Sequence, residues 1–174
     1  CIKNSGKTRS IAAENFTTDA DVLLTDENIN VIVELIDDAD AAFAIVKKAL
    51  ESGKAVVSAN KKMIAEHFEE LYALQQQYNT PFLYEAACCA SMPIIRNLEE
   101  YYDNDLLQSF RGIINGSTNF ILTKILREQV EFNESLLSAT KLGFAESNPI
   151  LDICGFDAAN KRCILMAHRF GSIA

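Results

Sequence analysis

The feature that most constrains the fold is an alternation of short apolar runs and a helical segment in the first half of the chain. Residues 30–36 (NVIVELI) and 54–58 (KAVVS) are β-branched runs between polar residues, which is typical of buried strands. Asp37 and Asp38 follow the first run as possible helix-cap residues. Residues 39–52 then place apolar side chains at helical spacing between the two runs, and Gly53 ends that segment. Strand, helix and strand in this order predict a parallel, right-handed βαβ unit.

The same alternation continues to residue 84. Residues 59–78 have a helical pattern with a break, and a short apolar run at 82–84 follows Pro81. We therefore expect residues 1–84 to form part of a doubly wound, Rossmann-like α/β nucleotide-binding domain, with ligands beyond the carboxyl ends of its strands. The sequence has no Gly-x-Gly-x-x-Gly phosphate loop and begins with Cys rather than Met, so we expect a fragment whose first strand and glycine turn lie upstream.

The second half of the chain changes character, and residues 85–174 are expected to form a separate α+β domain. Residues 108–115 alternate loosely and are interpreted as a strand, and residues 116–119 (GSTN) as a tight turn with a Ser/Thr cap. Four segments of this half have patterns typical of helices: residues 92–102, 120–127, 133–142 and 156 to about 170.

Composition and charge exclude several classes of protein. The net charge of −8 argues against a nucleic-acid or acidic-membrane partner, because either would call for a basic surface. No apolar run reaches the roughly 18 residues of a membrane span. The five cysteines include no Cys-x-x-Cys pair and the two histidines lie far apart, so we expect reduced thiols in the cytoplasm rather than a zinc site.

Residues 143–161 (GFAESNPILDICGFDAANK) hold the densest group of candidate functional side chains. Glycine and proline divide this stretch into short turns, as in loops that position functional groups. From residue 156 the pattern is helical, and Asp157, Lys161, Ile164 and His168 fall on one stripe. The spacing allows two interpretations: a solvated i,i+4 ion pair, or a pair directed into packed protein or a cleft.

Two further candidate positions follow predicted strands. Lys61 is placed to bind a phosphate or carboxylate or to donate a proton; the alternative is a solvated lysine in the first turn of a helix. Glu85 precedes the small residues 86–91, which either expose backbone carbonyls to a hard cation or simply pack tightly. Cys88 and Cys89 have no histidine nearby in sequence, so buried small side chains are favoured over a thiol nucleophile.

Five motifs occur in one order: VIVELI at 31–36, VVSANK at 56–61, YEA at 84–86 with MPI at 92–94, GIINGSTN at 112–119, and GFAE at 143–146 continuing to residue 161. With these motifs the chain resembles the homoserine dehydrogenase family over nearly all of its length after about residue 18, and the last two are the most specific. That family reduces aspartate 4-semialdehyde to homoserine with NADPH or NADH, on the path to threonine, methionine and isoleucine. The resemblance therefore implies an NAD(P)-dependent dehydrogenase.

The resemblance assigns roles to individual side chains. Lys161 resembles the active-site lysine that supplies or accepts the proton at the carbonyl oxygen, and Lys61 matches a second lysine close to both cofactor and substrate. Glu146 and Asp157 resemble the acids that hold the amino end of the substrate, and Asp152 resembles a further active-site carboxylate. The chemistry suits these groups, because hydride addition to an aldehyde builds negative charge on oxygen that a nearby ammonium stabilises and protonates.

Other matching positions concern the cofactor and an ion. Gly143 matches a glycine beside the nicotinamide, and Asp37 is a further cofactor position at a strand tip. Asp37 and Asp38 stand where the family commonly has two glycines, so their charges hinder a cofactor phosphate unless they face away. The backbone carbonyls of one segment bind sodium in the family, and its matching residues are Glu85, Cys88, Ala90 and Met92. The usual glycines are absent there, so any position that needs a positive φ would be strained.

The resemblance also implies a homodimer formed through the second domain and, in some members, a fused aspartate kinase. Two alternative functions remain open from the sequence. One is another NAD(P)-dependent oxidoreductase of a small amino or keto acid on the same scaffold, and the other is a non-catalytic binding or assembly module.

Overall fold

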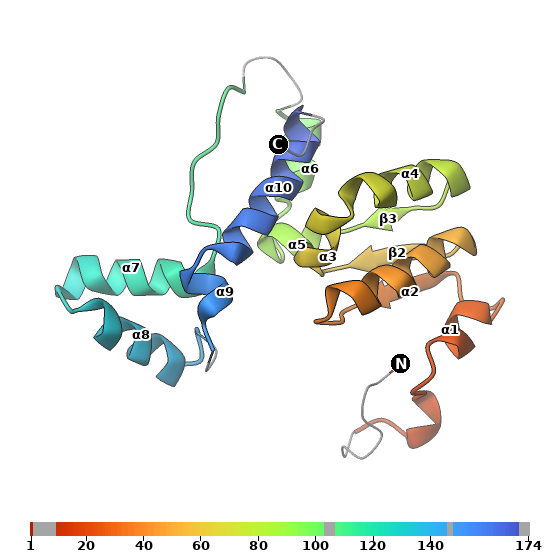
Figure 1. Ribbon diagram of the computed structural model, residues 1–174, viewed down its shortest axis with the longest axis horizontal. Coiled ribbons are helices and arrows are strands. Elements are labelled where there is room, and N and C mark those ends of the chain that lie inside the picture. The colour runs from red at the N-terminus through yellow and green to blue at the C-terminus, as the bar shows by residue number, and fades with distance from the viewer. Residues whose placement is uncertain (2–9, 103–106, 146–147, 171–174) are drawn as a thin grey trace. The chain divides into compact units, whose positions relative to one another are not determined.

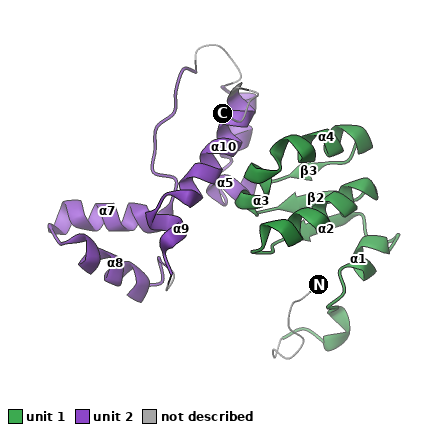
Figure 2. Ribbon diagram, viewed as in Figure 1, with its two compact units in different colours: residues 1–84 green, residues 85–174 purple. Residues whose placement is uncertain are grey.

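The computed structural model describes residues 1, 10–102, 107–145 and 148–170, which divide into two compact units (Figure 2). Unit 1 is Cys1–Tyr84 and unit 2 is Glu85–Ala174. The elements of unit 1 are η1 (Ala13–Asn15), α1 (Asp21–Thr25), β1 (Val31–Glu34), α2 (Ala39–Glu51), β2 (Ala55–Ser58), α3 (Lys61–Glu66), α4 (Phe68–Tyr78) and β3 (Phe82–Leu83). Those of unit 2 are α5 (Glu85–Cys89), α6 (Ile94–Glu100), α7 (Gly116–Glu128), α8 (Phe132–Lys141), α9 (Ile150–Ile153) and α10 (Phe156–Phe170).

Three parallel strands in the order β1–β2–β3 form the sheet of unit 1. Val33 of β1 is paired with Val57 of β2, and Val57 with Leu83 of β3. Helix α2 connects the first two strands, and α3 with α4 connects β2 to β3 (Figure 1). Both connections step in the same direction, so right-handed crossovers place these helices on one face of the sheet. The predicted mixed α/β fold with a parallel, Rossmann-like sheet is confirmed.

Burial separates the two faces of this sheet. Because side chains alternate along a strand, Val31 and Val33 of β1 and Leu83 of β3 point to one face, and all three are exposed. The opposite face and the helices that cover it form the core of unit 1, which includes Val46, Leu50, Val56, Met63, Ile64, Leu71 and Phe82. The helices therefore cover the sheet on one side.

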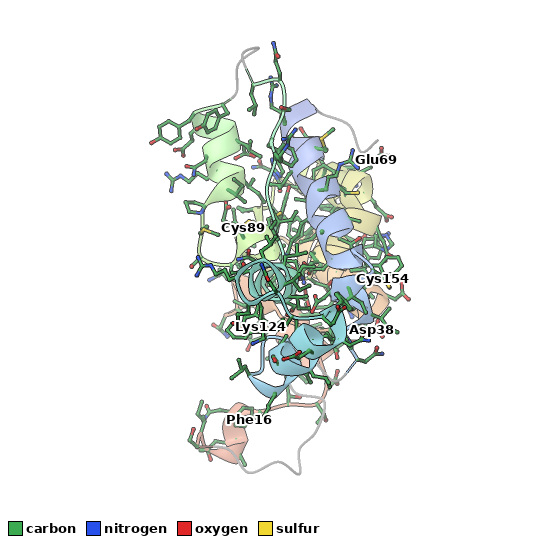
Figure 3. All side chains as sticks on the ribbon, turned by 90° about the vertical axis from the view of Figure 1, so that its left-hand side faces the viewer. Phe16, Asp38, Glu69, Cys89, Lys124 and Cys154 are labelled. Atoms are coloured by element: carbon green, nitrogen blue, oxygen red, sulfur yellow. The ribbon has the colours of Figure 1, made fainter. Side chains whose placement is uncertain are left out.

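Helix α2 shows how local sequence sets the element boundaries. The Asp38 side chain, labelled in Figure 3, accepts a hydrogen bond of 2.9 Å from the Ala41 backbone N–H and so caps the first turn. Gly53 follows the helix with a φ of 73°, a left-handed conformation that glycine adopts without steric cost. The predicted cap and the predicted stop are both confirmed.

The described residues of unit 2 form helices joined by irregular backbone and contain no strand. Helices α7 and α8 pack through Ile121 and Ala139, and Ala145 joins the same cluster. Helix α10 packs on α6 and α5, and buries Ile164 and Leu165. Helix α9 and the start of α10 lie beside the N-terminal end of α7. This packing brings together the polar side chains that are described in the next subsection.

Two local predictions for unit 2 are wrong. Residues 108–115 form irregular backbone without a strand partner in the described part of the chain, since the predicted alternation leaves Phe110 and Ile113 exposed. Residues 116–119 are the first turn of α7 rather than a separate turn, because Asn115 caps the helix earlier than predicted. Residues 85–89, for which no helix was predicted, form the short helix α5.

A membrane-spanning helix would have to be longer and more apolar than any helix in the described residues.

Candidate active site

The ion pair of Asp157 and Lys161 lies on the inner side of α10. Lys161 Nζ is 2.8 Å from Asp157 Oδ2, and the two side chains are only 14% and 11% exposed respectively. Further along the same stripe Ile164 is fully buried, and His168 Nδ1 lies 2.6 Å from Glu99 Oε1. The stripe therefore faces protein, and the interpretation of Asp157 and Lys161 as a solvated surface pair is wrong.

A second acceptor holds the lysine from the opposite side. Lys161 Nζ donates to the backbone carbonyl of Ile114 over 2.8 Å. An ammonium carries three N–H donors. Among the described residues the Lys161 ammonium has two acceptors, Asp157 and the Ile114 carbonyl, which leaves one N–H for an acceptor on a ligand. The geometry suits a group that stabilises and protonates a developing oxyanion.

Asn115 connects the two aspartates. Its side-chain Nδ2 donates to Asp152 Oδ1 over 2.7 Å and to Asp157 Oδ2 over 3.0 Å. Its Oδ1 accepts from the Thr118 backbone N–H over 2.8 Å, which caps α7. We call Asn115, Asp152, Asp157 and Lys161 the acid–lysine cluster.

Asp152 is held on both of its oxygens. Besides the bond from Asn115, Ser117 Oγ lies 2.7 Å from Asp152 Oδ2 and 2.6 Å from the carbonyl oxygen of Phe144. A hydroxyl has one proton and donates to one acceptor at a time, and the charged carboxylate of Asp152 is the stronger acceptor of the two. Asp152 thus joins α9 to the start of α7, and it is half-buried rather than solvated.

The structure describes the remaining residues of the predicted stretch 143–161 except for residues 146 and 147. Gly143 follows α8 with a φ of 79°, a conformation in which any other L-residue is strained. Its N–H donates to Thr140 over 3.1 Å, so this glycine turns the chain out of the helix. The predicted substrate acid Glu146 lies outside the described residues.

The predicted second lysine, Lys61, belongs to unit 1, where a separate polar cluster precedes it. Glu34 is 2% exposed and accepts from Ser58 Oγ over 2.5 Å and from the Ile36 backbone N–H. Asn60 donates from its amide to the Ile36 carbonyl over 2.9 Å and caps α3 by accepting from the Met63 N–H over 3.0 Å. We call Glu34, Ser58 and Asn60 the strand-tip cluster. Lys61 is the first residue of α3 directly after it and is half-buried.

Asp37 lies at the same sheet edge, between β1 and α2, and is exposed. The neighbouring Asp38 already supplies a carboxylate to the N-terminus of α2. A helix N-terminus favours an anion, and here that position is taken by a side chain of the protein. A cofactor phosphate is therefore not expected at the first turn of α2.

The segment predicted to hold sodium has its side chains committed elsewhere. The two oxygens of Glu85 accept from the backbone N–H groups of Ile95 at 2.9 Å and Arg96 at 3.0 Å, and so cap α6. Cys88 is buried, as predicted for a small apolar side chain, and Cys89, labelled in Figure 3, ends α5. No group of three or more His, Cys, Asp or Glu side chains in the described residues could hold a metal ion. A cation here would depend on backbone carbonyls.

Ala90 follows α5 with a φ of 51°. A left-handed conformation costs a residue other than glycine roughly 1–2 kcal/mol. The strain expected where the usual glycines are missing is therefore present, and it falls on Ala90.

The strand tips at residues 34–38 and 58–61 were expected to lie near ligands, but the sequence reasoning missed the role of Asn115 and the burial of Glu34. Asn115 was quoted within GIINGSTN but was not given a role, although an asparagine before Gly-Ser-Thr is a good helix cap. A glutamate inside the apolar run VIVELI was the signal for a buried acid at the strand tip.

The chain has half of a doubly wound sheet, followed by a helical unit in which a lysine and carboxylates cluster. These features are typical of nucleotide-binding α/β enzymes. Two family models match the chain: "Homoserine dehydrogenase, NAD binding domain" over residues 2–85 and "Homoserine dehydrogenase" over residues 93–173. The chain belongs to the homoserine dehydrogenase family.

Individual relatives agree with this assignment. The chain is 41% identical to the homoserine dehydrogenase of Helicobacter pylori over 89% of its own length and 36% of that protein. It is 37% identical to the enzyme of Bacillus subtilis over 94% of its length and 38% of that protein. The chain thus spans less than half the length of these curated relatives.

Two solved structures are similar to this chain. A homoserine dehydrogenase from Thiobacillus denitrificans matches with a TM-score of 0.80 and 38% identity, covering 89% of this chain and 36% of the other. A hyperthermophilic archaeal homoserine dehydrogenase, solved in complex with NADPH, matches with a TM-score of 0.78 and 31% identity, covering 91% and 49% of the two chains.

Proposed function

We propose that the protein containing this chain is an NAD(P)-dependent homoserine dehydrogenase, which reversibly reduces L-aspartate 4-semialdehyde to L-homoserine in the synthesis of threonine, methionine and isoleucine. The observation that carries the proposal is the placement of Lys161 between Asp157 and the Ile114 carbonyl, in a chain of this family. A half-buried ammonium with one remaining N–H is the group that carbonyl reduction requires.

Lys161 is the proton donor in this proposal. The reduced nicotinamide supplies a hydride to the aldehyde carbon when it is bound. Negative charge then grows on the aldehyde oxygen, and the Lys161 ammonium stabilises that charge and transfers a proton to it. The two fixed acceptors restrict where the ammonium can lie, which favours a reactive geometry over alternatives.

The acids bind the amino end of the substrate. Aspartate semialdehyde carries an ammonium, and a carboxylate is its natural partner. We propose that Asp157 and Glu146 make this contact. Asp152 completes the active-site carboxylates, with both of its oxygens already held by Asn115 and Ser117.

Unit 1 binds the cofactor, either NADP or NAD, at the carboxyl ends of its strands, where ligands of doubly wound sheets bind. We propose that Lys61, the first residue of α3 after the strand-tip cluster, contacts the cofactor and the substrate. We also propose that Gly143 contributes a backbone position beside the nicotinamide and that Asp37, which follows β1, is a further cofactor position. The NADPH complex of the archaeal relative supports a nicotinamide cofactor.

The resemblance supports four further proposals. A sodium ion would be held by backbone carbonyls of Glu85, Cys88, Ala90 and Met92, because carbonyl oxygens are ligands of hard cations. Unit 2 would form a homodimer, which its exposed apolar side chains Leu122, Leu126 and Leu137 support. We also propose a cytoplasmic location, and a fused aspartate kinase as found in some family members.

One assay tests the proposed reaction. The enzyme containing this chain is mixed with NADPH and either aspartate semialdehyde or unrelated aldehydes of similar size, and NADPH oxidation is followed at its absorbance maximum. We expect oxidation with aspartate semialdehyde to be at least about a hundredfold faster, because the carboxylates recognise its ammonium. Equal rates would point to another oxidoreductase on this scaffold, and no oxidation with any aldehyde would point to a non-catalytic module.

A further inference from the structure

Asn115 uses all of its hydrogen-bonding capacity within the acid–lysine cluster. Both N–H donors go to carboxylates, Asp152 Oδ1 and Asp157 Oδ2, and Oδ1 accepts from both the backbone N–H and the hydroxyl of Thr118. A side-chain amide has two donors and two acceptor sites. The residue is also buried, at 8% exposure.

Capping the helix alone would not require this residue type. Serine, threonine or aspartate cap a helix about as well as asparagine, and each needs only a side-chain oxygen. What asparagine adds is a neutral NH2 group that contacts two carboxylates at once. Like charges in close proximity repel, and a shared donor offsets that repulsion without adding a charge.

The backbone of the same residue places the second acceptor of the lysine. Asn115 is extended, with φ −131° and ψ 127°, and the carbonyl of its peptide bond to Ile114 accepts from Lys161 Nζ. Fixing the Asn115 side chain therefore fixes that carbonyl as well. Both acceptors of Lys161, Asp157 and Ile114, are held by contacts of a single residue.

We propose that Asn115 is a positioning residue of the reaction, a role that rests on the proposed function. It holds Asp152 and Asp157 side by side and sets the position of Lys161 through Asp157 and the Ile114 carbonyl. It does not contact the substrate in this role.

The test separates two functions of Asn115: capping of α7, and the bridge that its NH2 group makes between Asp152 and Asp157. Asn115→Ser in the enzyme containing this chain keeps a capping oxygen but is too short to reach both carboxylates. We expect kcat to fall at least about tenfold, the scale of a misplaced catalytic group, while the KM for NADPH stays within about twofold. Asn115→Asp also keeps the cap but adds a third carboxylate, so kcat should fall further. The matched control is Asn133→Ser, at an exposed position in the first turn of α8, with turnover as in the wild type.

A second measurement does not depend on activity. Without the amide, the carboxylates of Asp152 in α9 and Asp157 in α10 lose their shared donor and repel each other. Asn115→Asp places a third carboxylate beside these two, so it should lower the melting temperature more than Asn115→Ser does.

The outcomes are distinguishable. Turnover of Asn115→Ser within about twofold of the wild type, or a loss that only follows the unfolded fraction, would overturn the positioning role. If the wild-type enzyme does not reduce aspartate semialdehyde, the proposed function fails instead. The melting temperatures of the two variants then test the role of Asn115: an equal fall for Asn115→Ser and Asn115→Asp overturns the bridge between the carboxylates.

Discussion

Each unit contains a cluster of hydrogen-bonded polar side chains, and the two clusters are built differently. In the strand-tip cluster of unit 1 the one ionisable side chain, Glu34, is 2% exposed and accepts from a hydroxyl and a backbone N–H. The acid–lysine cluster of unit 2 has three ionisable side chains. Asp152 and Asp157 accept from the Asn115 amide, and Lys161 donates to Asp157 and to the Ile114 carbonyl. The first cluster fixes the backbone at the ends of two strands and at the start of a helix. The second cluster fixes the positions of charged side chains.

The difference indicates what each cluster can contribute. A buried acid that accepts from neutral groups stabilises the local backbone, and losing it leaves buried donors without partners. An ammonium held by two acceptors keeps a third donor for a ligand. We therefore expect substitutions in unit 1 to change mainly stability, and substitutions in unit 2 to change mainly turnover.

The largest effect is expected at Lys161. Lys161→Ala removes the proton donor, and kcat should fall at least about a hundredfold, the usual scale for a lost acid or base. The control is Lys62→Ala, which removes a lysine that is 59% exposed and pairs only loosely with Glu66 at 3.8 Å. Steady-state kinetics of both variants check this. Near-normal turnover of Lys161→Ala would remove this residue from the mechanism and leave unit 2 without its distinguishing feature.

The next effect is expected at Glu34. Glu34→Ala leaves the buried Ser58 hydroxyl and the half-buried Ile36 N–H without their acceptor, so the free energy of unfolding should fall by about 2–4 kcal/mol. Urea denaturation measures the change. Glu27→Ala, at an exposed turn position, should stay within about 0.5 kcal/mol of the wild type. A Glu34→Ala variant as stable as this control would contradict a structural role for the strand-tip cluster.

A smaller effect compares two left-handed residues, one in each unit. Ala90 has a φ of 51° and Asn79, which ends α4, a φ of 49°. Ala90→Gly should raise the free energy of unfolding by about 1 kcal/mol, because alanine is strained there. Asn79→Gly should change it by only a few tenths of a kcal/mol, because asparagine tolerates this conformation. Thermal unfolding measures both, and an equal response would show that Ala90 is not strained.

The smallest effect is expected at an exposed ion pair. Lys47 Nζ lies 2.8 Å from Glu70 Oε1, and this hydrogen bond raises the Lys47 pKa above its ordinary value of 10.5. A raised pKa stabilises the fold below the ordinary value, and the contribution is lost as the pH rises through the raised pKa. Glu70→Gln should lower the melting temperature slightly at neutral pH, less in about 1 M salt, and not at all in strong alkali. If Glu70→Gln destabilised the protein as much as Glu34→Ala, the conclusion that exposed ion pairs contribute less to stability than buried polar groups would be wrong.

Much of unit 1 could be predicted because its signals are local. The runs at 30–36 and 54–58, the cap at Asp38 and the stop at Gly53 all appear in the structure close to their predicted positions. Unit 2 was harder. The run 108–115 alternates weakly, and such alternation forms a strand only when a partner strand is present to accept its hydrogen bonds.

The sequence by itself determined the helical stripe of α10, and with it the alignment of Asp157 and Lys161, because a helix brings residues four positions apart together. It also determined the parallel strands of unit 1 through their apolar runs. Tertiary structure alone decided that the stripe is buried and that Asn115 meets Asp152, Asp157 and the lysine. Asn115 lies 37 positions from Asp152 and 42 from Asp157, and the Ile114 carbonyl lies 47 positions from Lys161. Periodicity reports only on near neighbours in the chain, whereas contacts at such separations depend on how the helices pack.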